Sequence, residues 1–223
     1  YGEFDRILSI LKNAIKLNPK NMRLRIRLIE ISARSGRLET AKHYLTEYPS
    51  IANAVYFYLV GDMKQCQKIL GEVDPSWRYT VQRMLFDIYV NPERVYLWNT
   101  TEPLSTPENL DKARAIVKET AFPDQELLTI KIKVAENTEE AVKTALLALP
   151  EEQVTPEMRM LRCSLNMRLG NVTLVKEELD SLLNEREFFE NVHVLEEARL
   201  LKALILRNEN KRKHSLQYVY MVI

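Results

Sequence analysis

The sequence feature that most constrains the fold is a turn signature that occurs three times. In each copy a Gly stands five residues before a small or compact residue, namely Gly36 before Ala41, Gly61 before Cys66 and Gly170 before Val175. An apolar-periodic run precedes each Gly and another follows it, which indicates two helices joined by a tight turn. Gly lets the chain leave the first helix with positive φ, and the small residue lets the second helix pack closely. Repeated helical hairpins of this kind predict an α-solenoid.

The repeats indicate an all-α chain. About six helical hairpins fit the sequence on the roughly 34-residue period of tetratricopeptide repeats. We therefore expect residues 1–223 to form a single α-solenoid segment. Apolar residues make up 46% of the chain and charged residues 28%, with only five Gly, which is the composition of a folded helical protein. Solenoids present extended surfaces to other proteins, so the fold predicts a binding function.

The apolar spacing and the helix-stop residues place the first hairpins. A helix is expected over residues 22–35 and a second over residues 38–47. The next hairpin is shorter, because few residues separate Pro49 from Gly61. We expect the aromatic run at residues 56–58 to fill the core where a helical turn is missing.

The fourth hairpin is interrupted. Asp74-Pro75 is a helix-start signal, and the helix that follows is expected to end near residue 89, before Asn91-Pro92. The helical pattern then lapses, so residues 92–107 are predicted to form an inserted loop within the hairpin. The later helix starts are expected at Thr106, Pro123, Thr155 and near Val194.

Both ends of the chain stop within a repeat pattern. Tyr1 falls inside an apolar-periodic helix with no initiator Met before it. Residues 218–223 end without a polar cap for the last apolar face. We therefore expect the chain to be a segment of a longer solenoid.

The sequence contains no recognisable catalytic or cofactor-binding constellation. The three His residues fall in different hairpins without a Cys, Asp or Glu at metal-ligand spacing, and no phosphate-binding loop or nucleophile elbow occurs. Cys66 and Cys163 lie far apart, and Cys66 occupies the small-residue position of its turn, where a thiol packs as a compact hydrophobe. We therefore predict a protein that is not an enzyme and that uses no metal or cofactor.

Charge and hydropathy argue against two kinds of partner. The net charge of +1 gives no general attraction to nucleic acid or to an anionic membrane. The run at residues 211–213 is expected to be an inter-helix turn rather than a nucleic-acid site. The longest apolar run, residues 54–60, is too short to cross a bilayer. These features predict a cytoplasmic protein whose partners are other proteins, with no nucleic acid and no direct membrane insertion.

Two features are candidate partner-binding residues. Arg23, Arg27 and Arg34 fall within about 40° of one another around a helix, at positions that often line the concave groove of tetratricopeptide units. Such a stripe would suit an acidic partner segment. The alternative is a solvated face paired with nearby Glu side chains, as charged runs on helices usually are. Trp98 in the inserted loop either anchors a partner, because Trp is enriched at binding hot spots, or folds back on its own solenoid.

The order of features resembles one family in particular. Residues 24–39 (Leu24-Arg25-Ile26-Arg27-Leu28-Ile29-Glu30-Ile31-Ser32-Ala33-Arg34-Ser35-Gly36-Arg37-Leu38-Glu39) are similar to the hairpin Leu-Ile-Asp-Leu-Leu-Arg-Arg-Cys-Gly-Lys-Leu-Glu of the tetratricopeptide repeat protein 21 family. In that family a shortened aromatic helix ending in Gly follows, then Asp-x-x-Trp, a helix that closes on Asn-Pro, and an insertion. The matching pieces are residues 56–61, 74–77, 88–92 and the segment up to Pro107. The resemblance covers residues 20–120, with Ser35 where the family has Cys and an insertion of different composition.

The family is the large solenoid subunit of intraflagellar transport complex A. The resemblance therefore implies a structural subunit of the train that returns cargo from the ciliary tip and admits membrane proteins, located at the cilium or flagellum and its base. It brings no catalytic residue with it. The resemblance implies a structural role for Gly36, Gly61, Trp77, Asn91 and Pro92. The turn signature adds Ala41, Cys66 and Gly170 to these structural positions.

Two alternatives stay open at this point. The first is a tetratricopeptide adaptor or co-chaperone that binds acidic peptide segments, although Glu30 stands where such a clamp needs Asn. The second is a helical repeat region attached to an enzyme outside this segment.

Overall fold

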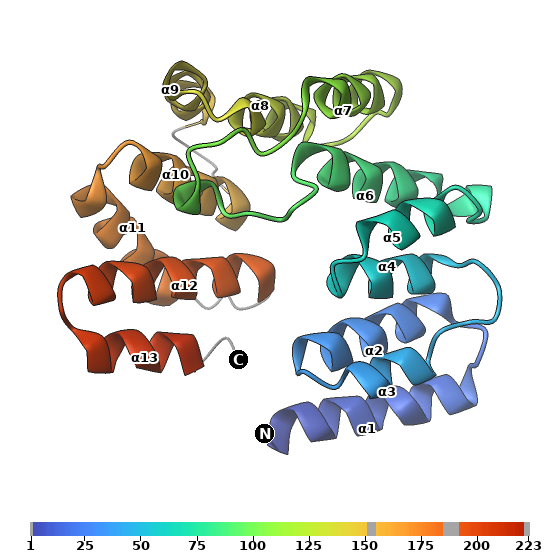
Figure 1. Cartoon of the computed structure of the whole chain (residues 1–223). Helices are drawn as coiled ribbons and strands as arrows, with labels where there is room; N and C mark the ends of the chain where they lie inside the picture. Colours follow the sequence, from blue (N-terminus) through green and yellow to red (C-terminus); the bar gives the residue numbers. More distant parts are fainter. Residues whose placement is uncertain (1, 151–154, 185–191, 221–223) are drawn as a thin grey trace. The chain divides into compact units, whose positions relative to one another are not determined.

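The structure, a computed structural model, describes residues 2–150, 155–184 and 192–220. In these ranges all regular structure is helical (Figure 1), with thirteen α-helices, two short 3₁₀-helices and no strand. Each helix packs mainly on the next helix in the chain or on the next but one, which is the contact pattern of a solenoid. The expected fold, an all-α tetratricopeptide-like solenoid, is confirmed.

The chain divides into two compact units, Tyr1–Ile88 (unit 1) and Tyr89–Ile223 (unit 2). Unit 1 contains α1 (Gly2–Leu17), α2 (Met22–Arg34), α3 (Leu38–His43), α4 (Ile51–Leu59), α5 (Met63–Leu70), the 3₁₀-helix η1 (Pro75–Trp77) and most of α6 (Arg78–Val90). Unit 2 contains the 3₁₀-helix η2 (Leu97–Asn99), α7 (Pro107–Glu119), α8 (Gln125–Glu136), α9 (Glu139–Ala148), α10 (Pro156–Arg168), α11 (Val172–Asn184), α12 (Val192–Asn208) and α13 (Arg212–Tyr220). That the two units continue one solenoid stays a prediction.

In unit 1, α2 is buried on two faces. Leu28 is fully buried against Leu8 of α1, whereas Ile29 is fully buried against Ala41 of α3 and Ala52 of α4. Successive residues of an α-helix point about 100° apart, so neighbouring positions meet different helices. The helix α2 therefore packs against neighbouring helices on two sides.

The helix α4 is short and aromatic. The Ser50 hydroxyl caps its start by accepting a hydrogen bond from the Asn53 amide at 3.3 Å. Phe57 and Tyr58 pack into a cluster with α5 and α6, while Tyr56 packs toward α2 and α3. The aromatic run thus fills the core of the shortened hairpin, as expected.

The helix α3 is shorter than the expected range of 38–47, because it ends at His43. The chain leaves the helix where Asn53 of α4 binds its backbone. The Asn53 side-chain amide donates to the carbonyl oxygens of Thr46 and Tyr48 at 2.9 and 3.2 Å, and its Oδ1 accepts from the Thr46 amide at 2.9 Å. These bonds replace the helical ones that the segment would otherwise make.

The three Gly turns are left-handed. Gly36, Gly61 and Gly170 have φ of +73°, +85° and +82°. In the first turn the Arg37 amide donates to the Ser32 carbonyl oxygen at 2.8 Å, which is the longer bond of a Schellman motif. The compact residues of the signature, Ala41, Cys66 and Val175, are all buried.

Asn takes the place of Gly in two further turns. Asn137 and Asn210 have φ of +49° and +62°. After Asn210 the Lys211 amide donates to the Leu206 carbonyl oxygen at 2.9 Å, as in the Gly turns. Asn tolerates the left-handed region better than most side chains do, because it bonds locally to the backbone. The same left-handed turn therefore recurs at two positions that have Asn in place of Gly.

Replacing Gly36 by Ala tests the left-handed turn. A Cβ at this position meets nothing within 4 Å, so the cost is backbone strain alone, and we expect the free energy of unfolding to fall by about 1–2 kcal/mol. Gly71→Ala is the matched control, because Gly71 caps α5 with φ of −68°, where Ala is allowed. Urea denaturation followed by circular dichroism should show a loss for Gly36→Ala only. Equal losses in the two variants would contradict this expectation.

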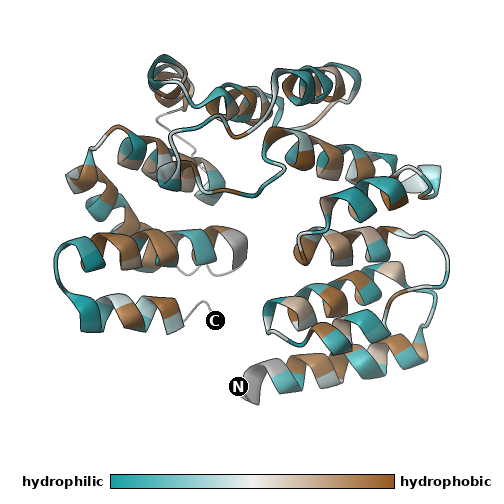
Figure 2. Ribbon diagram, in the orientation of Figure 1, coloured by the Kyte–Doolittle hydropathy of each residue, from teal (hydrophilic) through white to brown (hydrophobic). Residues whose placement is uncertain are grey.

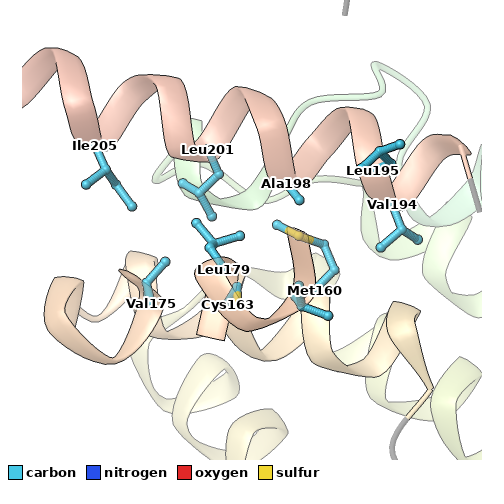
Figure 3. Close-up of a cluster of buried hydrophobic side chains, with 10 residues drawn as sticks. Met160, Cys163, Val175, Leu179, Val194, Leu195, Ala198, Leu201 and Ile205 are labelled. Carbon is cyan, nitrogen blue, oxygen red and sulfur yellow. The ribbon is translucent and has the colours of Figure 1, made fainter. Parts of the chain in front are cut away.

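Two buried clusters form the core of unit 2. The first joins α10, α11 and α12, and Figure 3 shows Leu179 of α11 pointing toward Leu201 of α12, with Cys163 of α10 beside it. The second cluster joins α8, α9 and α10, and it includes Leu97 of η2. A residue of the segment between α6 and α7 is therefore part of the core.

Candidate protein-binding surfaces

The basic face of α2 is the first candidate surface. Helical periodicity puts Arg23, Arg27 and Arg34 on the side of α2 opposite to its buried residues Leu28 and Ile29. The three positions therefore share one face, as their spacing requires.

The three guanidinium groups are not equivalent, however. Arg23 and Arg27 are exposed, whereas Arg34 is half-buried. Arg27 Nη1 lies 3.3 Å from Glu30 Oε2, and Glu30 belongs to the same face. An exposed pair of this spacing is worth only about 0.3–0.5 kcal/mol. The face therefore mixes two exposed arginines with an acidic side chain, and its role in partner binding stays a prediction.

Arg25, on another face of α2, has a structural role that the sequence analysis missed. Its Nη1 donates to the Tyr44 carbonyl oxygen at 2.9 Å and its Nη2 to the Pro19 carbonyl oxygen at 3.3 Å. The rigid fork of a guanidinium group suits such a bridge between two backbone segments. No sequence signal marks this arginine, because both acceptors are backbone atoms.

The inserted segment between α6 and α7 is the second candidate surface, and both of its ends are held. The Asn91 side chain donates to the Val95 carbonyl oxygen at 2.8 Å and accepts from the Val95 amide at 3.0 Å. At the other end the Ser105 hydroxyl donates to the Tyr89 carbonyl oxygen. In Figure 1 this green segment passes beside α10.

Two neighbouring side chains of the segment pack into unit 2. Leu97 is 5% exposed and lies among Ile130 of α8 and Leu165 of α10. Trp98 is half-buried, packs against the cluster of α10, α11 and α12, and stacks on Tyr96 with ring centroids 5.0 Å apart. Trp98 is therefore not available as a free anchor for a partner. Of the two alternatives, it folds back on its own solenoid.

Asn137 binds the backbone of the same segment. Its side-chain amide donates to the carbonyl oxygens of Thr100 and Glu102 at 3.2 and 2.7 Å, and its Oδ1 accepts from Arg168 Nε at 3.2 Å. Asn137 is only 2% exposed, and its left-handed backbone turns the chain from α8 into α9. One residue thus forms the turn of a hairpin and receives the inserted segment.

A half-buried carboxyl group lies at the Trp98 end of the segment. The Ser164 hydroxyl of α10 donates to Glu197 Oε1 of α12 at 2.9 Å. Burial raises the pKa of Glu197 above its usual value, and hydrogen bonding from Ser164 and Trp98 partly offsets that effect. The Trp98 Nε1 atom is buried and lacks a hydrogen bond of normal geometry among the described residues, so it acts on Glu197 as a poorly aligned donor.

We expect the raised pKa of Glu197 to make unit 2 more stable at low pH. The folded state binds the proton more tightly than the unfolded state, so this stabilisation is complete below the unfolded pKa, near 4.5, and is lost as pH rises through the folded pKa. Glu197→Gln removes the titration and should flatten the decline in melting temperature between pH 5 and pH 8. Glu196→Gln, on the same helix, is the matched control. If wild type and Glu197→Gln have the same pH profile, the prediction is wrong.

The thiols are structural. Burial raises the pKa of both Cys66 and Cys163 to about 12, so each is a neutral thiol near pH 7 rather than a nucleophilic thiolate. Among the residues that the structure describes, no group of three His, Cys, Asp or Glu side chains could hold a metal ion. In that same part of the chain, no helix is long and apolar enough to span a membrane.

The basic run at residues 211–213 lies at the turn into α13, which is hydrophilic in Figure 2. Glu209 Oε2 lies 2.9 Å from Lys211 Nζ, and the other carboxylate oxygen contacts Lys176. These two ammonium groups lower the pKa of Glu209 to about 2. Part of the basic run is therefore neutralised within the unit, as is typical of an inter-helix turn.

Comparison with known proteins agrees with the fold. Residues 1–62, from α1 to the turn before α5, match the tetratricopeptide repeat family model. No curated protein matches the chain. Residues 1–62 are thus similar to tetratricopeptide repeats, and such repeats typically act as scaffolds that bind other proteins.

Proposed function

We propose that the chain is a scaffold segment of intraflagellar transport complex A, acting in retrograde ciliary transport and in the entry of cargo into the cilium. The observation that carries the proposal is the order of features over residues 20–120. The order is the same as in the tetratricopeptide repeat protein 21 family. The hairpin α2–α3 comes first, followed by the short aromatic α4 before Gly61, then Asp74 and Trp77 ahead of α6, and last the insertion after Asn91.

The proposal is also supported by what the surfaces offer. The α-solenoid exposes long helical faces to other subunits, and the tetratricopeptide match in unit 1 is typical of protein scaffolds. The protein would then act in the cytoplasm, in the cilium and at its base.

Affinity purification tests the assignment. The tagged full-length protein is purified from ciliated cells, and co-purifying proteins are quantified by mass spectrometry against cells that express the tag alone. We expect the other complex A subunits in amounts comparable with the bait. Recovery of chaperones, or of an unrelated assembly without those subunits, would remove the ciliary assignment and leave the solenoid standing.

An adaptor for acidic segments is the second candidate, because the charge of the chain is unevenly distributed. Unit 1 carries 14 Lys and Arg against 9 Asp and Glu, and unit 2 carries 18 against 22. Arg23 and Arg27 expose two of the unit 1 cations on one face of α2. Glu30 on that face weakens its attraction for an acidic peptide.

A charge reversal separates the two candidates. Arg23→Glu with Arg27→Glu reverses the exposed pair and leaves the half-buried Arg34 intact. Lys64→Glu with Lys68→Glu on α5 makes the same change in net charge elsewhere in unit 1. An adaptor loses its co-purifying partners only in the α2 variant. Equal recovery of partners by both variants would exclude the acidic-segment function of this face.

A further inference from the structure

Residues 94–105 of the inserted segment lie on the helices of unit 2 in the manner of a bound peptide. Leu97 belongs to the buried cluster of α8, α9 and α10, and Trp98 packs against the cluster of α10, α11 and α12. Three of these helices, α8, α10 and α12, are the first helices of successive hairpins. Stacked hairpins of a solenoid form extended surfaces that bind other molecules. The segment therefore occupies the surface on which a partner would be expected to bind.

Two kinds of recognition hold the segment. Leu97 and Trp98 are adjacent apolar anchors, and apolar anchors seated among helices give peptide recognition its affinity. Within the segment, the Asn137 side-chain amide donates to backbone carbonyl oxygens, those of Thr100 and Glu102. A side-chain amide that binds main-chain atoms accepts any extended segment in the right register, whatever its side chains are.

The fit of the segment is imperfect at one point. The Trp98 indole N–H is buried beside Glu197 without a well-formed hydrogen bond, although Glu197 already accepts one from Ser164. A segment that places its aromatic N–H in better alignment with this carboxyl group would gain a bond that the resident segment lacks. The carboxyl group of Glu197 is therefore a hydrogen-bond acceptor that the inserted segment does not fully use.

We propose that this face of unit 2 is a binding groove for an extended partner segment that carries an aliphatic residue followed by Trp, and that residues 94–105 are its intramolecular competitor. The occupant is a segment of another protein, and the insertion must leave for it to bind. The proposal concerns unit 2 alone and does not rest on the ciliary assignment.

The test supplies the segment from outside. The probe is a fluorescent synthetic peptide of residues 94–105, and the protein is the full chain with Leu97→Ala and Trp98→Ala, whose fold is verified by circular dichroism. Fluorescence anisotropy should show that the peptide binds this variant at least about tenfold more tightly than it binds wild type. Removal of the two anchors weakens the resident segment and leaves the groove intact.

Two controls establish that binding uses the groove. A peptide with both anchors changed to Ala should not bind. Asn137→Gly, added to the double variant, keeps a residue that tolerates positive φ but removes the carboxamide, and it should weaken peptide binding. Absence of binding to the folded double variant, or equal binding of the Ala peptide, would overturn the proposal. If the wild-type protein is a dimer and the peptide dissociates it, the occupant is not a segment of another protein. The two copies would then exchange their inserted segments.

Hydrogen exchange on the wild-type chain tests the same proposal without any substitution, which matters if the double variant does not fold. The Leu104 amide donates to the Ala135 carbonyl oxygen at 2.8 Å, so its exchange reports departure of the segment. A competitor that leaves its groove must open while the helices stay folded, so this amide should exchange faster than the amides of α10. Exchange of Leu104 only together with α10 would make the insertion a permanent part of the core and would overturn the proposal.

Discussion

Leu28→Ala is expected to lower the free energy of unfolding of unit 1 by about 2–5 kcal/mol. Leu28 is fully buried and packs against Leu8 and Ile15 of α1. The truncation removes apolar contacts and leaves a cavity that the stacked helices fill only in part. In a solenoid each helix is held mainly by its neighbours, so the loss falls on the interface of α1 with α2.

Leu17→Ala is the matched control for this effect. Leu17 is also on the α1 side of the unit but is 88% exposed, and its truncation should change stability by no more than about 0.5 kcal/mol. Chemical denaturation gives the two free energies, and hydrogen exchange should locate the loss of protection in α1 and α2. Equal stabilities of the two variants would show that Leu28 does not carry the interface.

The turns show how far sequence reasoning reaches in this chain. Gly36, Gly61 and Gly170 could be found because only Gly enters the left-handed region without strain, so its presence after an apolar run is a strong signal. Asn137 and Asn210 form turns of the same hand. They gave no such signal, because Asn is also common at helix starts and in loops.

The inserted segment shows where sequence reasoning stops. Pro92 and Pro107 interrupt the helical periodicity of the sequence, and in the structure α6 ends at Val90 and α7 begins at Pro107. The surface on which the segment packs could not be predicted, because its bonds join residues more than thirty positions apart, as between Asn137 and Thr100. Periodicity describes only the near neighbours of a residue along one element.

The basic face of α2 has a similar limit. Spacing alone predicts that Arg23, Arg27 and Arg34 share a face, because helical geometry is regular. It does not predict the depth to which each side chain is buried, which depends on the neighbouring helices. Glu30 stands where a clamp for acidic peptides needs Asn, and it contacts Arg27 in the structure. The face is thus predictable and its charge pattern is not.

Leu179→Ala is expected to produce a loss of similar size in unit 2, about 2–5 kcal/mol. Leu179 is fully buried at the centre of the cluster in Figure 3, where α11 contacts both α10 and α12. Leu174→Ala on the same helix is the matched control, because Leu174 is 56% exposed and its loss leaves no cavity.

The two cysteines allow this loss to be measured separately in each unit. Cys163 lies in the Leu179 cluster and is protected from thiol reagents by burial and by its raised pKa, so it reacts when the cluster opens. A loss of 2 kcal/mol or more should raise its labelling rate at least about 30-fold if opening and closing are fast. Cys66 packs among residues of unit 1 only, so its labelling rate should stay unchanged in the same sample. Equal acceleration of both thiols would show that the two units open together, because opening confined to the Leu179 cluster leaves the packing around Cys66 intact.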